Sequence, residues 1–392
     1  MKFITDLDVK GKLVFLRVDF NVPLDDAGGI RDDTRIRASL PTIQYLLGHG
    51  ARLVIASHLG RPKGKPDPKM SLGPAARRLG ELVTARVVMA PDVIGDEVDR
   101  LKREIKDGQA LVLENVRFYK EEEANDPSFS RKLADGVDIF VNDAFGSSHR
   151  AHASVVGIAA FVKDKAAGFL MKKEVDYLTK AVHSPEKPYV AILGGAKVSD
   201  KIEIIESLLA KADHILIGGA MAYTFLKAQG FGVGKSLAED DQKATALAIL
   251  SKAAEKKVEF LLPLDHLLAT AAEAGAATRT VDTLPFPEDM MGVDIGPRTV
   301  EAYSRIIRAA KTIFWNGPMG IFEIEPFAAG TVGIARAVAA SGAVSIVGGG
   351  DSIAAVKKAG VKDKISHIST GGGASLEYIA YDSLPGIDAL EG

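Results

Sequence analysis

The chain has no cysteine among its 392 residues. Disulfides, thiolate metal sites and cysteine nucleophiles are therefore excluded. It also has no uninterrupted apolar run near the ~18 residues that a membrane-spanning helix needs. The first residues, MKFITDLDVKGK, hold no apolar core of signal-peptide length. We therefore expect a cytoplasmic protein that makes no contact with a membrane.

A strong net charge is also absent. Lys and Arg number 49 against 51 Asp and Glu, so the formal net charge is -2. The two signs are interleaved along the chain, which argues against a nucleic-acid groove and against a membrane-facing basic surface. Any anion site must be local. At 47% hydrophobic residues the chain can form two cores of ordinary size, so we expect two domains, and a monomer could be stable.

Short apolar runs rich in Val, Ile, Leu and Phe alternate with longer amphipathic stretches. This alternation is typical of parallel βαβ units. We predict an α/β fold with two Rossmann-like, doubly wound parallel-sheet domains joined by a helical hinge. The predicted strands are 13–20, 52–57, 87–90, 110–113 and 139–142 in the first half, and 189–193, 214–217, 258–262, 312–315, 343–347 and 366–368 in the second.

A helix is predicted between the two halves. Four apolar residues spaced by four, three and four positions mark one of its faces: Met171, Val175, Leu178 and Val182. The two prolines of HSPEKP, at 183–188, end the helix. This helix could instead belong wholly to one domain. The predicted division is 1–170 for the first domain, 171–187 for the connector, 188–375 for the second domain, and 376–392 for a C-terminal segment that returns to the first domain.

Charged side chains follow the predicted strands of the first half. In open parallel sheets, ligands bind beyond the carboxyl ends of the strands. Of the 19 arginines, 14 lie within residues 1–170, and arginine can grip phosphate or carboxylate with two hydrogen bonds. A lone loop arginine is more often a surface group, and Arg17 and Arg37 could be structural. The candidates for an anionic small-molecule site are Arg35, His58, Arg61, Arg117 and Arg150.

The second half has glycines at the equivalent positions. Gly194, Gly195 and Lys197 follow one predicted strand, and Lys201 comes four residues after Lys197, so the two lysines would share a face of a helix starting there. Glycines recur in GGAMAY and WNGPMG, at 218–223 and 315–320.

Two later strands run directly into three glycines, in IVGGGDS and ISTGGGAS at 346–352 and 368–375. A strand that ends on glycines and restarts as a helix leaves backbone N–H groups at a positive helix end, which suits phosphate. A nucleotide is therefore the expected ligand. Asp351 could hold Mg²⁺ that bridges phosphate oxygens. Alternatively, it could cap a helix that starts near Ser352.

Two nucleotide motifs are excluded. GVGKS at 232–236 resembles the end of a P-loop, but position 229 is Gln229 where a glycine is needed, and a helical pattern precedes it. No G-x-G-x-x-G follows the first strand, which weighs against a nicotinamide-dependent dehydrogenase. That class and a non-catalytic nucleotide-binding protein remain the alternatives. The three glutamates at 121–123 are expected on a solvated face.

Nine segments together resemble the phosphoglycerate kinase family, in the family's order and at its spacings. The similarity runs from Asp6 to the terminal LPGIDAL. The segments are VDFNVP, TRIRASLPTI, SHLGRP, ENVRF, GSSHRAHASV, LGGAKVSDKI, WNGPMGIFE, GGGDS and STGGGASLE.

The resemblance implies a phosphotransferase with a carboxyl group as acceptor, active in glycolysis and gluconeogenesis. It would transfer the acyl phosphate of 1,3-bisphosphoglycerate to MgADP, giving ATP and 3-phosphoglycerate, by hinge closure and without a general base. The implied substrate residues are Asp19, Asn21, Arg35, His58, Arg61, Arg117 and Arg150. The implied nucleotide residues are Lys197, Lys201, Gly292, Asn316, Glu323, Gly349, Gly350, Asp351 and Ser352, with Asp351 at the metal; Gly292 and Glu323 rest on the resemblance alone. The implied catalytic groups are Arg35, Lys197, Lys201, Gly371 and Gly372.

Overall fold

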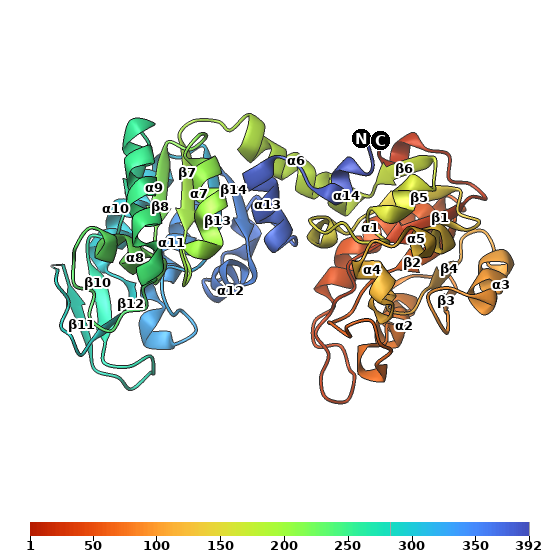
Figure 1. Ribbon diagram of the computed structural model, residues 1–392, viewed down its shortest axis with the longest axis horizontal. Helices are drawn as coiled ribbons and strands as arrows, with labels where there is room; N and C mark the ends of the chain where they lie inside the picture. The colour runs from red at the N-terminus through yellow and green to blue at the C-terminus, as the bar shows by residue number, and fades with distance from the viewer. Residues whose placement is uncertain (283, 392) are drawn as a thin grey trace. The chain divides into compact units, whose positions relative to one another are not determined.

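The computed structural model describes residues 1–282 and 284–391, which form two compact α/β units (Figure 1). The first unit comprises Met1–Asp176 together with Ser383–Gly392, and the second comprises Tyr177–Asp382. Helix α6 (Phe169–His183) begins in the first unit, and the boundary between the units falls within it.

The first unit is built on a six-stranded parallel sheet with the order β3-β4-β2-β1-β5-β6. Its central strands are fully buried because each is a continuous apolar run covered on both faces. In register, Leu16 of β1 lies beside Ile55 of β2 and Val141 of β5. The strands are β1 (Leu13–Arg17), β2 (Arg52–Ala56), β3 (Val87–Met89), β4 (Ala110–Val112), β5 (Ile139–Asn142) and β6 (Asp164–Ala167).

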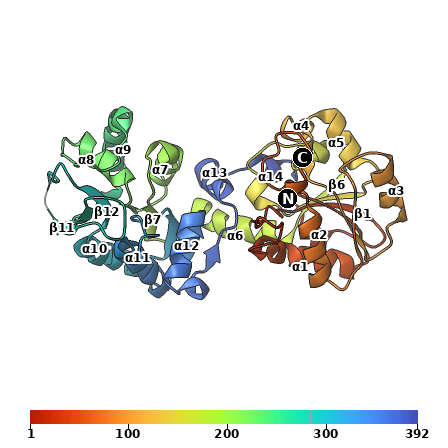
Figure 2. The same cartoon turned by 90° about the horizontal axis from the view of Figure 1, so that it is seen from below.

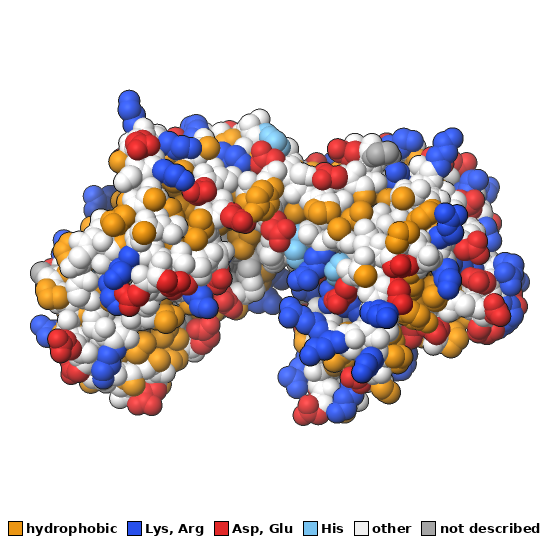
Figure 3. Space-filling model, in the orientation of Figure 1, with side chains coloured by type: hydrophobic (Ala, Val, Ile, Leu, Met, Phe, Trp, Pro, Cys, Tyr) orange, Lys and Arg blue, Asp and Glu red, His pale blue; other side chains and the backbone are white. Residues whose placement is uncertain are grey.

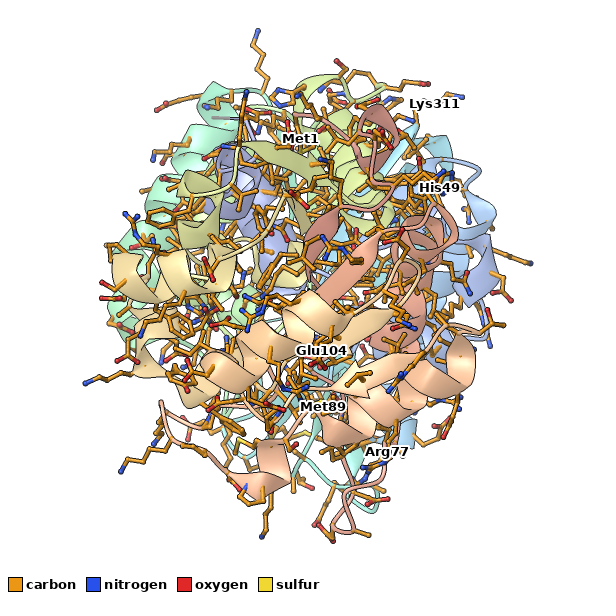
Figure 4. All side chains as sticks on the ribbon, turned by 90° about the vertical axis from the view of Figure 1, so that its right-hand side faces the viewer. Met1, His49, Arg77, Met89, Glu104 and Lys311 are labelled. Carbon is orange, nitrogen blue, oxygen red and sulfur yellow. The ribbon has the colours of Figure 1, made fainter. Side chains whose placement is uncertain are left out.

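Helices cover both faces of this sheet. Figure 2 shows α1 and α2 on one side and α4 and α5 on the other. Ile36 and Ile43 of α1 and Leu79 of α2 pack against β1 and β2 in one buried cluster. Figure 4 looks onto this unit and labels two of its exposed positions, Arg77 on α2 and Glu104 at the end of α3. The helices are α1 (Thr34–Gly48), α2 (Gly73–Leu82), α3 (Asp96–Glu104), α4 (Lys120–Glu123), α5 (Pro127–Ala134) and α14 (Pro385–Asp388).

Both ends of the chain belong to the first unit and lie side by side in Figure 1. The amino group of Met1 lies 3.6 Å from Glu391 Oε1. Gly386 N donates to Ser148 O at 2.8 Å, and its own carbonyl accepts from Asn142 Nδ2 at 3.1 Å. These hydrogen bonds hold α14 against the carboxyl end of β5.

The second unit contains a six-stranded parallel sheet with the order β15-β14-β13-β7-β8-β9 and a three-stranded antiparallel sheet with the order β11-β10-β12. The parallel strands are β7 (Tyr189–Leu193), β8 (His214–Ile217), β9 (Glu259–Leu261), β13 (Thr312–Asn316), β14 (Val344–Gly348) and β15 (His367–Ile368). The antiparallel strands are β10 (His266–Ala269), β11 (Thr278–Val281) and β12 (Met291–Ile295).

Helices also cover both faces of the larger sheet. Figure 2 shows α7, α8, α9 and α13 on one side and α10, α11 and α12 on the other. Trp315 of β13 is fully buried among side chains of α10, α11 and α12. The helices are α7 (Ile202–Leu208), α8 (Met221–Ala228), α9 (Lys243–Glu255), α10 (Pro297–Ala309), α11 (Ala329–Ala340), α12 (Gly350–Lys358) and α13 (Gly373–Tyr381).

The prediction of two parallel-sheet α/β domains is confirmed, and each predicted strand is observed within a few residues of its expected bounds. Two features were missed. One is the edge strand β6, which has the sequence DKAA. The other is the antiparallel sheet, whose strand β11 has three of its four residues exposed. The solvated-face prediction for 121–123 is wrong for Glu122, whose side chain is fully buried.

Candidate active-site residues

Polar side chains after β1 and β2 lie together in the first unit. Arg35 Nη1 at the start of α1 donates to both carboxylate oxygens of Asp19, each at 2.8 Å. Asn21 N donates to Asp19 Oδ1 at 3.1 Å, and Asn21 Oδ1 accepts from Gly60 N at 2.9 Å. These contacts tie three segments far apart in sequence to one end of the sheet, as expected for the carboxyl ends of parallel strands.

Asp19 and His58 have shifted pKa values. Burial disfavours the ionised form of Asp19, yet the neighbouring charges, Arg35 among them, and the hydrogen bond from Asn21 N outweigh burial and lower its pKa. Burial holds the pKa of His58 well below its ordinary value, although Asp19 acts in the opposite direction. His58 is therefore neutral at neutral pH, and Arg35 then remains a charged partner of Asp19.

Three further arginines lie around the same loops. Arg117, in a short 3-10 helix (Val116–Phe118), donates from Nη1 to Gly60 O at 2.9 Å. Burial lowers the pKa of Arg117, and the nearby charge of Arg150 lowers it further. Arg61 and Arg150 are exposed, and Arg150 Nε lies 3.1 Å from His149 Nε2. Figure 3 shows Lys and Arg side chains gathered on the lower left part of this unit.

Arg37 lies outside this cluster. It is half exposed and pairs with Asp33 of its own helix turn at 2.9 Å, which fits the structural role considered for it. Arg17 is buried, and Ser154 Oγ accepts from its Nε at 2.8 Å.

In the second unit, glycines let three loops interlock at the carboxyl ends of β7, β8 and β13. Gly194 N donates to Asn316 O at 3.0 Å, and Gly219 N donates to Met319 O at 2.8 Å. A Cβ on Gly194 would lie 2.0 Å from Pro318 O, and a Cβ on Gly317 would lie 2.2 Å from Gly194 O. These glycines are required by packing between backbones.

The two triple-glycine turns have the expected strand–turn–helix arrangement. One joins β14 to α12, and the other joins β15 to α13. Gly349 and Gly372, the residues before the two helices, have φ angles of +91° and +55°. A Cβ on Gly350 or Gly373 would meet no atom within 4 Å. The first amides of both helices therefore border open space, where an anion can approach them.

Lys201 is the residue directly before α7 and contacts the last residue of β13. Its Nζ donates to Asn316 Oδ1, while Asn316 Nδ2 donates to Gly348 O at 2.8 Å. Gly317 N donates to Ser352 Oγ at 2.6 Å. Burial lowers the pKa of Lys201 to about 8, although Asp200 and Asp351 oppose the shift. Lys201 remains largely protonated at neutral pH.

The prediction that Lys197 and Lys201 share a helix face is wrong. Residues Ser199–Lys201 form a 3-10 turn, and α7 begins only at Ile202. Lys197 therefore lies in an irregular segment before the turn.

A cavity of about 270 Å³ lies beside these loops. Its walls are largely glycine and apolar side chains, with two carboxylates, Glu323 and Asp351. The lining residues are Gly195, Ala196, Gly219, Ala220, Tyr223, Leu237, Met291, Gly292, Val293, Pro318, Met319, Gly320, Ile321, Glu323 and Asp351. The strand pattern gave no indication of Gly292 or Glu323. Gly292 belongs to β12, in the sheet that was missed, and a Cβ there would lie 2.0 Å from Tyr223 Oη.

Asp351 is an exposed residue in the first turn of α12, whose N-cap is Gly349. The alternative that Asp351 caps the helix is therefore wrong. Within residues 1–282 and 284–391, no group of three or more His, Cys, Asp or Glu side chains could hold a metal ion. A single carboxylate beside open helix-end amides suits a hard divalent cation that takes its other oxygen ligands from phosphate and water.

The GVGKS segment follows α8, and no helix begins directly after it. Lys235 N donates to Met290 O at 2.8 Å, and Ser236 Oγ accepts from Gly292 N at 2.9 Å. The segment supports the neighbouring sheet, so its rejection as a P-loop is confirmed. In the described part of the chain, no helix is both long enough and apolar enough to cross a membrane.

Comparison with known proteins gives a consistent result. The family model described as phosphoglycerate kinase matches residues 4–381. A phosphoglycerate kinase of Acidobacterium capsulatum is 60% identical, over 99% of this chain and 98% of its own length. One from Anaeromyxobacter sp. (strain K) is 57% identical over 100% of this chain and 99% of its own.

A solved structure shows the same relationship. The structure of phosphoglycerate kinase from Coxiella burnetii is similar with a TM-score of 0.91 and 42% sequence identity. That similarity covers 99% of this chain and 97% of the other. The similarities in sequence and structure extend through both units and both candidate sites, and the chain belongs to the phosphoglycerate kinase family.

Proposed function

We propose that the first unit binds 3-phosphoglycerate or 1,3-bisphosphoglycerate and that the second binds MgADP or MgATP. The reaction is the reversible transfer of the acyl phosphate of 1,3-bisphosphoglycerate to ADP. One observation carries this division: arginine and histidine side chains gather in one unit, whereas glycine turns with open helix-end amides border an apolar cavity in the other.

The substrate site uses side chains of the first unit. Guanidinium groups can each give two hydrogen bonds to a phosphate or carboxylate, and the neutral His58 ring can donate one more. Asp19 and Asn21 orient Arg35 and the Gly60 loop through the hydrogen bonds described above. The proposed substrate residues are Asp19, Asn21, Arg35, His58, Arg61, Arg117 and Arg150.

The nucleotide site uses backbone and apolar surface of the second unit. The cavity of about 270 Å³ has a size and apolar lining that suit a purine base, with Gly292 in its wall and Glu323 as a hydrogen-bond acceptor. The turn at Gly349 and Gly350 and the ammonium groups of Lys197 and Lys201 suit the phosphates. Asn316 and Ser352 hold Lys201 and the loop after β13 in place.

Asp351 is the residue that would hold Mg²⁺ bound to the nucleotide. Its carboxylate is exposed beside the cavity, and it is a hard oxygen ligand of the kind that Mg²⁺ prefers. When bound, the ion would neutralise charge on the phosphate oxygens.

The transfer itself needs no general base. In the direction of ATP consumption the attacking group is a carboxylate, which is already ionised at neutral pH. Catalysis then depends on alignment and on stabilising the negative charge of the phosphoryl group in transit. We assign this stabilisation to Arg35, to the largely protonated Lys201 and to the amides at Gly371 and Gly372, with Lys197 holding the phosphates.

Because the two ligands are assigned to different units, transfer requires the units to close on one another about α6. Closure would also exclude water from an acyl phosphate that water can hydrolyse. Small-angle scattering with both ligands, one ligand and neither should give the smallest radius of gyration with both. An unchanged radius would count against closure while leaving the two binding sites intact.

The decisive experiment is a coupled assay for ADP-dependent consumption of 1,3-bisphosphoglycerate. ADP with Mg²⁺ should also raise the melting temperature, and NAD should not, because a ligand stabilises the protein that binds it. Stabilisation by NAD alone would favour a dehydrogenase, and stabilisation by ADP without turnover would favour a passive nucleotide-binding protein. We further propose a cytoplasmic monomer, to be checked by cell fractionation and sedimentation equilibrium.

A further inference from the structure

A chain of buried hydrogen bonds lies behind His58 in the first unit. Glu122 on α4 accepts from Ser154 N at 2.9 Å and from Ser154 Oγ at 2.6 Å. Ser154 Oγ in turn accepts from Arg17 Nε at 2.8 Å. Arg17 Nη2 lies 3.2 Å from His58 Nδ1. Glu122 and Ser154 are fully buried, and Arg17 is 1% exposed.

The chemistry of Arg17 fixes the direction of its hydrogen bonds. Its Nε–H can only donate, so Ser154 Oγ accepts from it and the hydroxyl hydrogen can point to Glu122 Oε1. Burial raises the pKa of Glu122, while Arg17 and the hydrogen bonds from Ser154 favour its ionised form. A guanidinium group can only donate, so His58 Nδ1 must be the acceptor. A proton on Nδ1 would place two donors opposite each other. The proton of the neutral ring therefore sits on Nε2.

We infer that Glu122, Ser154 and Arg17 are positioning residues that hold His58 in its Nε2–H tautomer, so that Nε2 donates a hydrogen bond to an anionic ligand. The other tautomer would present a lone pair to the anion, which is repulsive. This inference rests on the proposed function, in which His58 contacts phosphoglycerate.

Further contacts around Arg17 and His58 agree with this arrangement. Arg17 also donates from Nη1 to Val18 O, so its guanidinium group is held on three sides. Among residues 1–282 and 284–391, no protein group forms a hydrogen bond with His58 Nε2. The charges of Arg17, Arg117 and Arg35 add to burial in lowering the His58 pKa, while Asp19 opposes them. His152 Nδ1 lies 3.9 Å from Glu122 Oε1, and burial lowers the His152 pKa to about 4, so His152 is neutral at neutral pH.

The first test reads the tautomer directly in the full-length protein without ligand. With ¹⁵N-histidine labelling, long-range NMR correlations should show His58 with Nδ1 unprotonated and Nε2 protonated across pH 6 to 8. The signal is assigned by its loss in His58→Asn. A wild-type His58 that carries its proton on Nδ1, or that is doubly protonated at pH 7, overturns the inference.

The second test removes the central hydroxyl. Ser154→Ala should bring the Nδ1–H form into view and raise the KM for 3-phosphoglycerate about tenfold, with a smaller change in kcat, because one buried charge-assisted hydrogen bond is lost. Glu122→Gln should shift both quantities in the same direction. The matched control is Ser130→Ala: Ser130 is equally buried in this unit, and its Oγ has no hydrogen-bond partner in the described chain.

An unchanged tautomer and an unchanged KM in a folded Ser154→Ala protein would overturn the inference. The same would follow if Ser130→Ala had as large an effect. If Ser154→Ala does not fold, the wild-type tautomer still decides. A wild-type chain without phosphoryl transfer would refute the proposed function instead, since the tautomer measurement requires no substrate.

Discussion

The two units present their candidate anion sites by different means. The first unit uses side chains. Arg35 pairs with Asp19, Arg117 donates a hydrogen bond to the Gly60 carbonyl, and His58 is hydrogen-bonded to Arg17. The second unit relies on backbone, with two glycine turns at the starts of α12 and α13. Side chains can be changed one atom group at a time, whereas a backbone site can be changed only through the residues that shape it.

Glycines in the second unit therefore fall into two groups with different physical roles. Gly194 and Gly317 lie where two backbones touch, so a Cβ has no room. Gly350 and Gly373 border open space, so a Cβ has room but could obstruct a ligand. The first group maintains the fold, and we assign the second to the phosphates. Substitutions in each unit test this contrast.

The largest effect is expected for Arg35→Ala. If Arg35 stabilises the phosphoryl group in transit, kcat should fall on the order of 10³-fold, as for other arginines at phosphoryl groups. ADP affinity should stay at the wild-type value because Arg35 belongs to the first unit. Steady-state kinetics and ADP calorimetry check both quantities. Arg37→Ala is the matched control, because Arg37 lies one half-turn further along α1 and pairs with Asp33. Equal losses in kcat and in ADP affinity would refute the assignment.

A smaller loss of turnover is expected for Lys201→Met, on the order of 10²-fold, because one preorganised donor is removed. The fold should persist, since an apolar side chain can replace a largely buried charge. The wild-type pKa of about 8 means that Lys201 loses its charge as pH rises through 8. The kcat/KM of the wild type, which reports the free protein, should therefore fall as pH rises through about 8, and this fall should be absent in the variant. Lys252→Met, which removes an exposed ion pair with Glu206 on α7, is the control. Near-normal turnover would remove Lys201 from the mechanism.

The glycine contrast predicts opposite outcomes for two substitutions in the second unit. Gly194→Ala should lower the free energy of unfolding by about 3 kcal/mol, because its Cβ overlaps the Pro318 carbonyl. Gly373→Ala should leave the free energy of unfolding almost unchanged and should lower kcat. Trp315 is the single tryptophan and lies in this unit, so its fluorescence follows the unfolding directly. Comparable stability of both variants would contradict the packing role of Gly194.

The sequence predicted the parallel sheets because their strands are short, apolar and separated by helical patterns. It missed the antiparallel sheet because β11 is mostly exposed and has no apolar alternation to mark it. Gly292 was also missed, because it belongs to β12 of that sheet, a buried strand that the pattern of apolar runs did not predict. Glu122 was assigned to solvent because three consecutive glutamates suggest a surface, yet a short helix turns one of them inward to Ser154. Burial of one charge among neighbours depends on tertiary contacts, which local pattern does not report.

The smallest effect is expected from replacing two buried aspartates, Asp143 in the first unit and Asp294 in the second. Burial raises the pKa of each to about 7. Asp143 Oδ1 accepts from Met171 N at 3.0 Å, and no hydrogen bond of normal geometry reaches its Oδ2, although Thr42 and the Leu170 backbone favour the ionised carboxylate. Asp294 accepts with both oxygens, from Ile295 N at 2.9 Å and from Gly330 N at 2.6 Å. Asn can therefore replace Asp143 with its hydrogen bond intact, but in place of Asp294 its amide nitrogen would face an N–H group.

A raised folded-state pKa contributes stability that is fully present below the unfolded-state pKa near 4 and is lost as pH rises through about 7. The folded protein with Asp143→Asn has no such carboxylate. Its unfolding free energy, followed by urea titration, should exceed that of the wild type by an amount that grows by about 2 kcal/mol from pH 5 to pH 8. Asp294→Asn should instead be destabilising at pH 5 by about 2 kcal/mol, because one buried N–H group loses its acceptor. The same pKa would then have opposite consequences for substitution in the two units, decided by whether the second carboxylate oxygen has a partner. Equal pH dependence in the wild type and in Asp143→Asn would mean that burial does not raise the pKa of Asp143.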